Sequence, residues 1–242
     1  MNSLITKPGV HVLILLGAIA SFVFFQFFYP YHLFYQEQNQ LFLFSWDYIT
    51  TYLDKPGWLA CLTGDFLTQF YYYRFAGPTI LTLSILMAGY NVRCGVEDTD
   101  IKGTWIPYTI AIAVMTMLVC FSLHYDYRLS SIIAIAGGAN VFRFSTKILV
   151  STRMFVKKLE SLAERHTSID GTRLPQWITA VSIFISMLVC HWFFGCGMWI
   201  YAALVLLGCI KYINKPGNYT RLAAIAIPLF IIMLEKRLYF VD

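Results

Sequence analysis

The segment VHVLILLGAIASFVFFQFF, residues 10–28, decides the fold class of this chain. It contains no lysine, arginine, aspartate or glutamate and has about the 20 apolar residues that a transmembrane α-helix needs. Lys7 precedes it, as in a secretory signal peptide, but the apolar part is too long for one. Tyr29-Pro30-Tyr31-His32 follows in place of a small-residue cleavage site. We interpret the segment as a membrane anchor that stays in the protein.

Six further apolar segments are predicted to cross the membrane after the first. They cover about Gly77–Tyr90, Trp105–Ser122, Leu129–Val150, Trp177–Phe194, Met198–Ile213 and Leu222–Leu234. Pro78, Pro107 and Pro175 stand in or near the first turn of three segments, where a proline costs no helical hydrogen bond. The sequence therefore predicts an all-α, polytopic transmembrane bundle of about seven spans, with residues 1–242 as a single integral membrane domain.

The composition of the whole chain agrees with a membrane-embedded domain. Of its 242 residues, 58% are hydrophobic and only 13% are charged, whereas about 25% are charged in soluble domains. A soluble fold of this composition would expose too much apolar surface. The six cysteines form no CxxC pair, and a structural zinc site normally needs four ligands. We expect the cysteines to be small apolar packing residues, with no metal bound.

The lysines and arginines predict how the helices are oriented. If the N-terminus faces the cytoplasm, the outer side keeps only five of the 18: Lys55, Arg74, Arg128, Lys236 and Arg237. This asymmetry fits the positive-inside rule. The longest inner loop, 151–176, is a basic and acidic mixture typical of a solvated connector. The net charge of +5 is therefore interpreted as a topology signal, and nucleic acid is not an expected partner.

The first outer loop, Tyr29 to Ala76, is unusually long. Loops of this length without structure are uncommon and are usually functional. The loop divides at Lys55-Pro56-Gly57 into two helical pieces. In the second piece, apolar residues recur at steps of three or four positions, at Leu59, Leu62, Phe66, Phe70 and Tyr73. Asp65 and Gln69 lie on another face. The sequence thus predicts two amphipathic helices in the membrane interface.

Two carboxylates on this side form the candidate site. Glu37 lies just behind the first span; it is either idle in solvent or held as a general base or cation ligand. Asp126 lies in the short outer loop 123–128, where it either pairs with His124 or Arg128 or converges with Glu37. The sharper hypothesis makes Glu37 and Asp126 catalytic. The accompanying substrate-binding residues would be Asp47, Asp65, Gln69, His124 and Arg128.

Two features within the spans have simpler interpretations. The run Ala134 to Asn140, AIAGGAN, consists of small residues that let helices approach closely, so we predict a packing face there. Arg143 stands near the cytoplasmic end of its predicted span, where its guanidinium can reach the interface.

The first outer loop carries a family resemblance. The run His32-Leu-Phe-Tyr-Gln-Glu37, Lys55-Pro56-Gly57 and Phe66-Leu-Thr-Gln-Phe70 resemble the N-terminal region of an uncharacterised polytopic inner-membrane family of Bacteroidota. This resemblance implies a multi-pass protein of the bacterial inner membrane with a cytoplasmic N-terminus. It implies no activity.

The layout of one span, a long outer loop and a return span is similar to that of the C-type (GT-C) glycosyltransferases. Such enzymes carry acidic residues in the first outer loop and in a later one, and Glu37 and Asp126 match these positions. The resemblance implies sugar transfer from a polyprenyl-phosphate donor, with a divalent cation as the implied cofactor. The chain differs from them in having Gln38 after Glu37, no DxD motif in this loop and fewer spans.

Three classes of function follow from these features. The first is a membrane subunit or scaffold of unknown activity, whose aromatic interfacial helices dock another membrane subunit. The second is a GT-C-like enzyme that binds a polyprenyl-phosphate lipid. The third is a transporter component, which would need ionisable groups at mid-membrane, where the spans offer little beyond Arg143. The lipid bilayer is a partner in all three.

Overall fold

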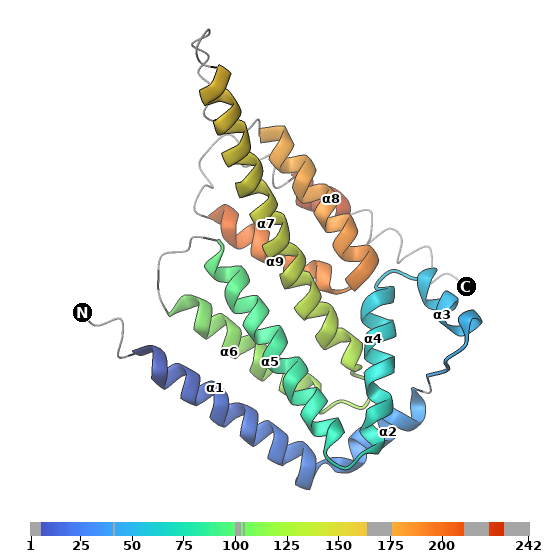
Figure 1. The fold of residues 1–242 in the computed structure, drawn as a ribbon. Helices are drawn as coiled ribbons and strands as arrows, with labels where there is room; N and C mark the ends of the chain where they lie inside the picture. Colours follow the sequence, from blue (N-terminus) through green and yellow to red (C-terminus); the bar gives the residue numbers. More distant parts are fainter. Residues whose placement is uncertain are drawn as a thin grey trace.

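The computed structural model describes residues 6–40, 42–99, 103, 105–163, 176–210 and 223–229, and all regular structure among them is helical (Figure 1). The all-α prediction is therefore confirmed for this part of the chain. The named elements are α1 (Thr6–Val23), the π-turn η1 (Phe24–Phe28), α2 (Pro30–Asn39), α3 (Trp46–Leu53), α4 (Trp58–Thr68), the 3-10 turn η2 (Gln69–Tyr72), α5 (Ala76–Glu97), α6 (Ile106–Phe121), α7 (Leu129–Ala163), α8 (Gln176–Phe194) and α9 (Gly197–Ile210).

Three of these helices are long and apolar enough to cross a membrane: Gly9–Phe28, Ala76–Glu97 and Leu129–Thr152. The apolar helices Ile106–Phe121, Ile178–Phe194 and Gly197–Cys209 are shorter. The seven predicted spans are thus not confirmed, because apolar composition alone does not say where a helix ends. The last predicted span, Leu222–Leu234, is described only at residues 223–229.

Two helices run further than their apolar residues indicate. α5 continues to Glu97, beyond the predicted end at Tyr90, and an Arg93–Glu97 ion pair of 2.9 Å spans its last turns. α7 continues to Ala163 and so takes up the first half of the segment 151–176, which was expected to be a loop. Neither glycine nor proline interrupts α7 after Gly138, so nothing in the sequence breaks it there.

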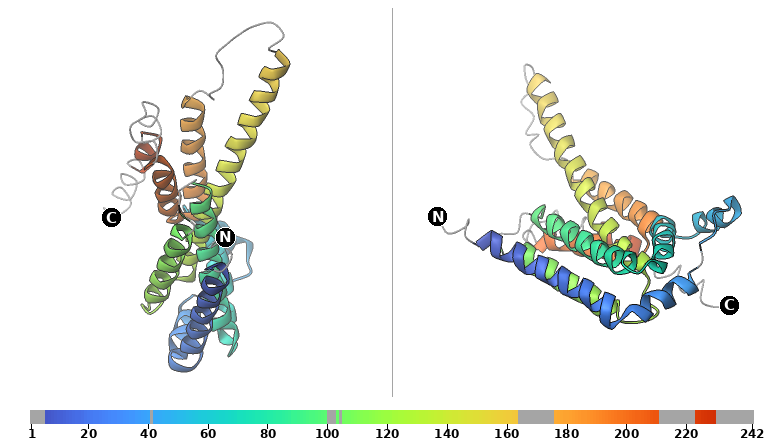
Figure 2. Two further views of the ribbon diagram at one scale, coloured as in Figure 1. Left: turned by 90° about the vertical axis from the view of Figure 1, so that its left-hand side faces the viewer. Right: turned by 60° about the horizontal axis from the view of Figure 1, so that its bottom comes forward.

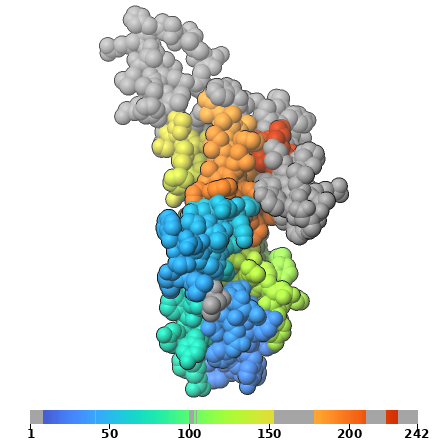
Figure 3. Space-filling view, turned by 90° about the vertical axis from the view of Figure 1, so that its right-hand side faces the viewer, coloured from blue at the N-terminus to red at the C-terminus, as the bar shows by residue number. Residues whose placement is uncertain are grey.

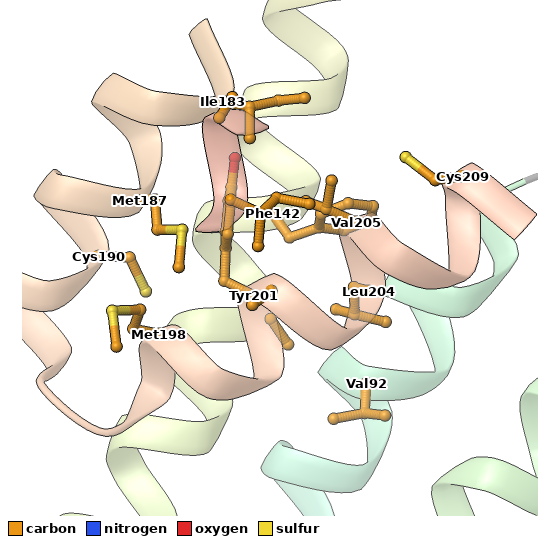
Figure 4. Packing of buried hydrophobic residues seen from close by; sticks show 14 of the residues in the cluster. Val92, Phe142, Ile183, Met187, Cys190, Met198, Tyr201, Leu204, Val205 and Cys209 are labelled. Atoms are coloured by element: carbon orange, nitrogen blue, oxygen red, sulfur yellow. The ribbon is translucent and has the colours of Figure 1, made fainter. Parts of the chain in front are cut away.

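α7 is the central helix of the bundle and contacts α4, α5, α8 and α9. α1, α5 and α6 lie on one side of it, with α5 in contact with both others (Figures 1 and 2). α8 lies on its other side, and α9 crosses α7 and contacts α5, α7 and α8 (Figure 1). Buried side chains of α5, α7, α8 and α9 form one apolar cluster, centred on Met187, Met198 and Tyr201 (Figure 4). A second cluster joins α5, α6 and α7 to η1 through Phe25 and to α2 through Leu33.

The run of small residues on α7 is a packing face, as predicted. A Cβ atom added at Gly138 would collide with the carbonyl oxygen of Gly197, and one added at Gly197 would collide with that of Ala134. A Cβ at Gly137 would collide with the Phe194 ring. The turn between α8 and α9 therefore lies backbone against backbone on α7, which only small residues allow.

Residues 29–75, which we call the cap, fold across one end of the bundle (Figures 1 and 3). Gly57, in the α3–α4 turn, donates its N–H to the Trp192 carbonyl at 2.9 Å. Gly57 and Gly195 both have positive φ, and a Cβ on Gly57 would lie 3.1 Å from the Gly195 Cα. A Cβ on Gly64 of α4 would lie 2.7 Å from the Ser130 nitrogen at the start of α7. The cap thus packs on two helix ends: Gly57 lies against Gly195 after α8, and Gly64 lies against the start of α7.

The cap contains more helices than the two predicted. The first piece divides because residues 42–45 are not helical, and Ser45 Oγ accepts the N–H of Tyr48 to begin α3. In α4 the buried residues are Ala60, Gly64, Asp65 and Thr68, whereas Phe66 and the following Phe70 are exposed. α4 thus turns its small and polar face inward and its aromatic face outward.

Candidate functional site

The cap meets the turn between α6 and α7 at His32 of α2. Pro30 in the first turn starts α2, and the i, i+4 spacing places His32 and Gln36 on one buried face. The His32 ring lies 5.1 Å from the Tyr29 ring and 4.8 Å from the Tyr125 ring, between centroids. Gln36 Nε2 donates to the Tyr127 carbonyl at 2.8 Å. These contacts fix α2 to the α6–α7 turn.

His32 is only 1% exposed, and this burial lowers its pKa below the ordinary value of 6.5. A hydrogen bond with the Ser122 backbone raises the pKa, but by less than burial lowers it. Its Nε2 lies 3.2 Å from Gln36 Nε2, which can only donate. The neutral ring therefore accepts at Nε2, and this hydrogen bond assigns its proton to Nδ1.

A second polar group lies between α3 and α4. Tyr52 donates its hydroxyl to Asp65 Oδ2 at 2.7 Å, and the Tyr48 and Tyr52 oxygens are also 2.7 Å apart. Burial and these hydrogen bonds raise the pKa of Tyr52, so it stays a donor at neutral pH. Burial and the Asp65 charge raise the pKa of the nearby Cys61 thiol, opposed by Arg128 and Lys55. Asp65 is therefore occupied as a hydrogen-bond acceptor within the cap.

The predicted catalytic pair lies beside the first of these contacts. Gln36 precedes Glu37, and Tyr127 follows Asp126, so the Gln36–Tyr127 hydrogen bond places the two elements side by side. Glu37 is half-buried and Asp126 is exposed. Within the described ranges, neither carboxylate makes a hydrogen bond or ion pair with another described residue. The convergence of Glu37 and Asp126 stays a prediction.

The other predicted site residues lie in the cap and in the α6–α7 turn. Asp47 is exposed in the first turn of α3, and Gln69 donates to the Gln40 carbonyl at 2.5 Å. His124 and Arg128 are exposed. The ion pairs of the described residues join Arg93 to Glu97 and Arg143 to Asp98, so no ion pair of Asp126 with His124 or Arg128 is formed.

With this geometry in hand, the comparisons with known proteins give one result. The model of a family of unknown function (DUF6057) matches residues 5–241. The chain belongs to this family. Comparison with the curated proteins and with the solved structures finds no match. Membership in DUF6057 confirms the resemblance to an uncharacterised family. The bacterial phylum and the GT-C likeness stay predictions.

For this DUF6057 protein, sequence reasoning missed the residues on which the cap contacts depend. His32 and Gln36 belong to the run that carries the family resemblance, and their i, i+4 spacing is a signal for one buried face. Tyr52 gives no comparable signal, because its bond to Asp65 depends on the turn at Gly57. Among the described residues, no three His, Cys, Asp or Glu side chains come together as metal ligands would. The divalent cation implied by the GT-C resemblance stays a prediction.

Proposed function

We propose that this protein is a non-catalytic subunit of the bacterial inner membrane, crossing it several times with its N-terminus in the cytoplasm. Its cap would dock a second membrane protein. The three long apolar helices support the membrane location, and the lysine and arginine distribution supports the orientation.

The observation that carries this proposal is how the cap uses its polar and aromatic residues. Several of its polar side chains are engaged inside the fold, since Gln36 bonds Tyr127, Tyr52 bonds Asp65 and Gln69 bonds Gln40. Trp58 Nε1 and the Tyr71 hydroxyl are buried without a hydrogen-bond partner among the described residues. Several of its aromatic side chains point outward, among them Phe44, which is 81% exposed, and Trp46, which is 74% exposed. Aromatic residues are enriched at protein interfaces. A surface of this kind suits docking better than chemistry.

Residues 42–46, which include Phe44 and Trp46, are held in place by contacts with α4. The Phe42 ring lies 5.1 Å from the Phe44 ring and 5.7 Å from the Phe66 ring of α4, between centroids. The Tyr52–Asp65 hydrogen bond fixes the following helix. A preorganised aromatic surface binds with a smaller entropy loss than a mobile one.

The test is photo-crosslinking in native membranes, with benzoyl-phenylalanine at Phe44 or Trp46. A matched control carries it at Phe144, an exposed aromatic side chain of α7 outside the cap. We expect both cap positions to crosslink to the same protein and the control to crosslink to lipid. That protein should co-purify in a fixed ratio and be lost from Phe44→Ser and Trp46→Ser variants. Lipid adducts alone at all three positions would overturn the proposal.

A GT-C-like glycosyltransferase is the second candidate, favoured by the Gln36–Tyr127 hydrogen bond that brings the elements of Glu37 and Asp126 together. In this alternative, Glu37 or Asp126 deprotonates the acceptor or holds a divalent cation. Asp47, Asp65, Gln69, His124 and Arg128 would bind the substrate, so Asp65 would have to release Tyr52. A polyprenyl-phosphate-linked sugar would be the donor. Transfer that is abolished by Glu37→Gln but kept by Glu97→Gln, a matched change outside the cap, would favour the enzyme.

A transporter component stays third. Arg143 pairs with Asp98 at 3.4 Å, and Asp98 directly follows the last residue of α5. This pair therefore lies at a helix end, whereas a transport site would place ionisable groups near the middle of the membrane.

A further inference from the structure

A cavity of about 410 Å³ lies between α1, α5 and α6. Its walls include Gly17 and Ser21 of α1, Thr82 and Leu86 of α5, and Ile112 and Met115 of α6. The volume is within the roughly 300–1,000 Å³ of small-molecule sites. Leu13, which also lines it, is 57% exposed, so the cavity reaches the surface of the helix bundle.

Two hydroxyl groups in this wall are buried without a hydrogen-bond partner among the described residues, Ser21 Oγ and Thr82 Oγ1. The Thr82 residue is only 8% exposed. Thr116 lines the same cavity but donates to its own helix, to the Ile112 carbonyl at 2.9 Å. An unpaired buried hydroxyl in apolar surroundings costs free energy. Neither oxygen is accessible from the cavity, so a ligand there meets a predominantly apolar lining.

The lining is apolar toward the cap as well as away from it. Phe24 and Val119 lie nearer the cap, and Leu13, Leu86 and Ile112 lie further from it. The cavity thus suits an apolar chain along its whole length.

We propose that this cavity binds one acyl chain of a phospholipid. The chain lies against Leu86 and Ile112. The phospholipid reaches the site directly from the bilayer, because the α1 wall is exposed at Leu13 and Gly17.

Two glycines of α1 give a matched test of the cavity. A Cβ on Gly17 or on Gly9 would meet no atom within 4 Å, but only Gly17 lines the cavity. The full chain, purified in lipid nanodiscs, is released and its bound phospholipid is measured by native mass spectrometry. We expect Gly9→Leu to retain phospholipid like the unmodified protein and Gly17→Leu to retain about tenfold less. Equal retention in the two variants would overturn the proposal.

Discussion

Small residues have opposite consequences on α7 and on α1. On α7, Gly138 lies against the backbone of Gly197, with no room for a Cβ atom. On α1, Gly17 lies near α5 and α6, yet a Cβ there would meet nothing within 4 Å. A run of small residues thus shows where helices are able to approach. Whether they do depends on what the neighbouring helix presents.

The neighbours explain the difference. The α8–α9 turn presents a glycine backbone to α7, so the two backbones can touch. α5 and α6 instead close on each other, because the Met115 side chain fills the place where a Cβ of Gly89 would be. The cavity lies between this pair of helices and α1. The packing of α7 on the α8–α9 turn is therefore tight, whereas the packing of α1 on α5 and α6 is loose.

The largest expected effect comes from breaking the tight junction. In Gly138→Leu the new side chain collides with the Gly197 carbonyl, and a backbone atom cannot move aside as a flexible side chain can. We expect a loss of about 3 kcal/mol in the free energy of unfolding, at the upper end of ordinary overpacking. Steric trapping in bicelles measures this. The same substitution at Gly17 is the control, and a similar loss there would contradict the comparison.

The second effect concerns the glycine contact that seats the cap. Gly57 has φ of 80° and touches Gly195, so Gly57→Ala forces an alanine into the left-handed region against another backbone. We expect a loss of about 2 kcal/mol and faster amide hydrogen exchange in α3 and α4. Gly9→Ala, in an ordinary helical conformation, should show neither change. Unchanged exchange in α4 would show that this contact does not seat the cap.

The third effect is a pH dependence of stability, which we expect around His32 of α2 but not at the α7–α9 junction. Burial lowers the pKa of His32, so the unfolded chain binds this proton more readily than the folded protein does. Stability should be constant above the unfolded value of 6.5 and fall as the pH drops below it. After correction for the intrinsic rates, hydrogen exchange in α2 and at the end of α1 should be faster at pH 5.5 than at pH 7.5. The α7–α9 junction should stay protected at both pH values.

The matched variant for this effect is His32→Phe, which keeps a ring between Tyr29 and Tyr125 but cannot be protonated. It should remove the pH dependence of exchange in α2. The same pH dependence in His32→Phe would mean that another group causes the loosening.

The smallest effect comes from filling the loose side. Gly17→Leu adds an apolar side chain where no atom stands in its way and replaces a glycine within a helix. Leucine is better than glycine in a helix by about 1 kcal/mol, and Gly9→Leu should show this gain alone. In lipid-free detergent Gly17→Leu should be the more stable of the two, by its contacts in the cavity. A Gly17→Leu variant no more stable than Gly9→Leu would mean that the cavity closes in detergent.

Local sequence features predicted what depends on local properties. The all-helical class, the structured loop before α5 and the packing face on α7 followed from apolar runs, loop length and the AIAGGAN stretch. Helix ends were less predictable, because α7 continues to Ala163 through polar residues that composition marks as a connector. The role of Asp65 was not predictable, since Tyr52 reaches it only after the chain turns at Gly57.

The contact between Gly57 and Gly195 has a consequence for biosynthesis. The ribosome delivers the α3–α4 turn early, whereas the α8–α9 turn that receives it emerges more than half of the chain later. Domains generally fold from the N-terminus during synthesis, but the Gly57 contact of the cap cannot form before the α8–α9 turn has been made. Until then the α3–α4 turn and the bare glycine face of α7 are open to insertion factors and quality-control proteases. Nascent chains stalled before α8 should therefore be cut within the cap, and chains stalled after α9 should be protected.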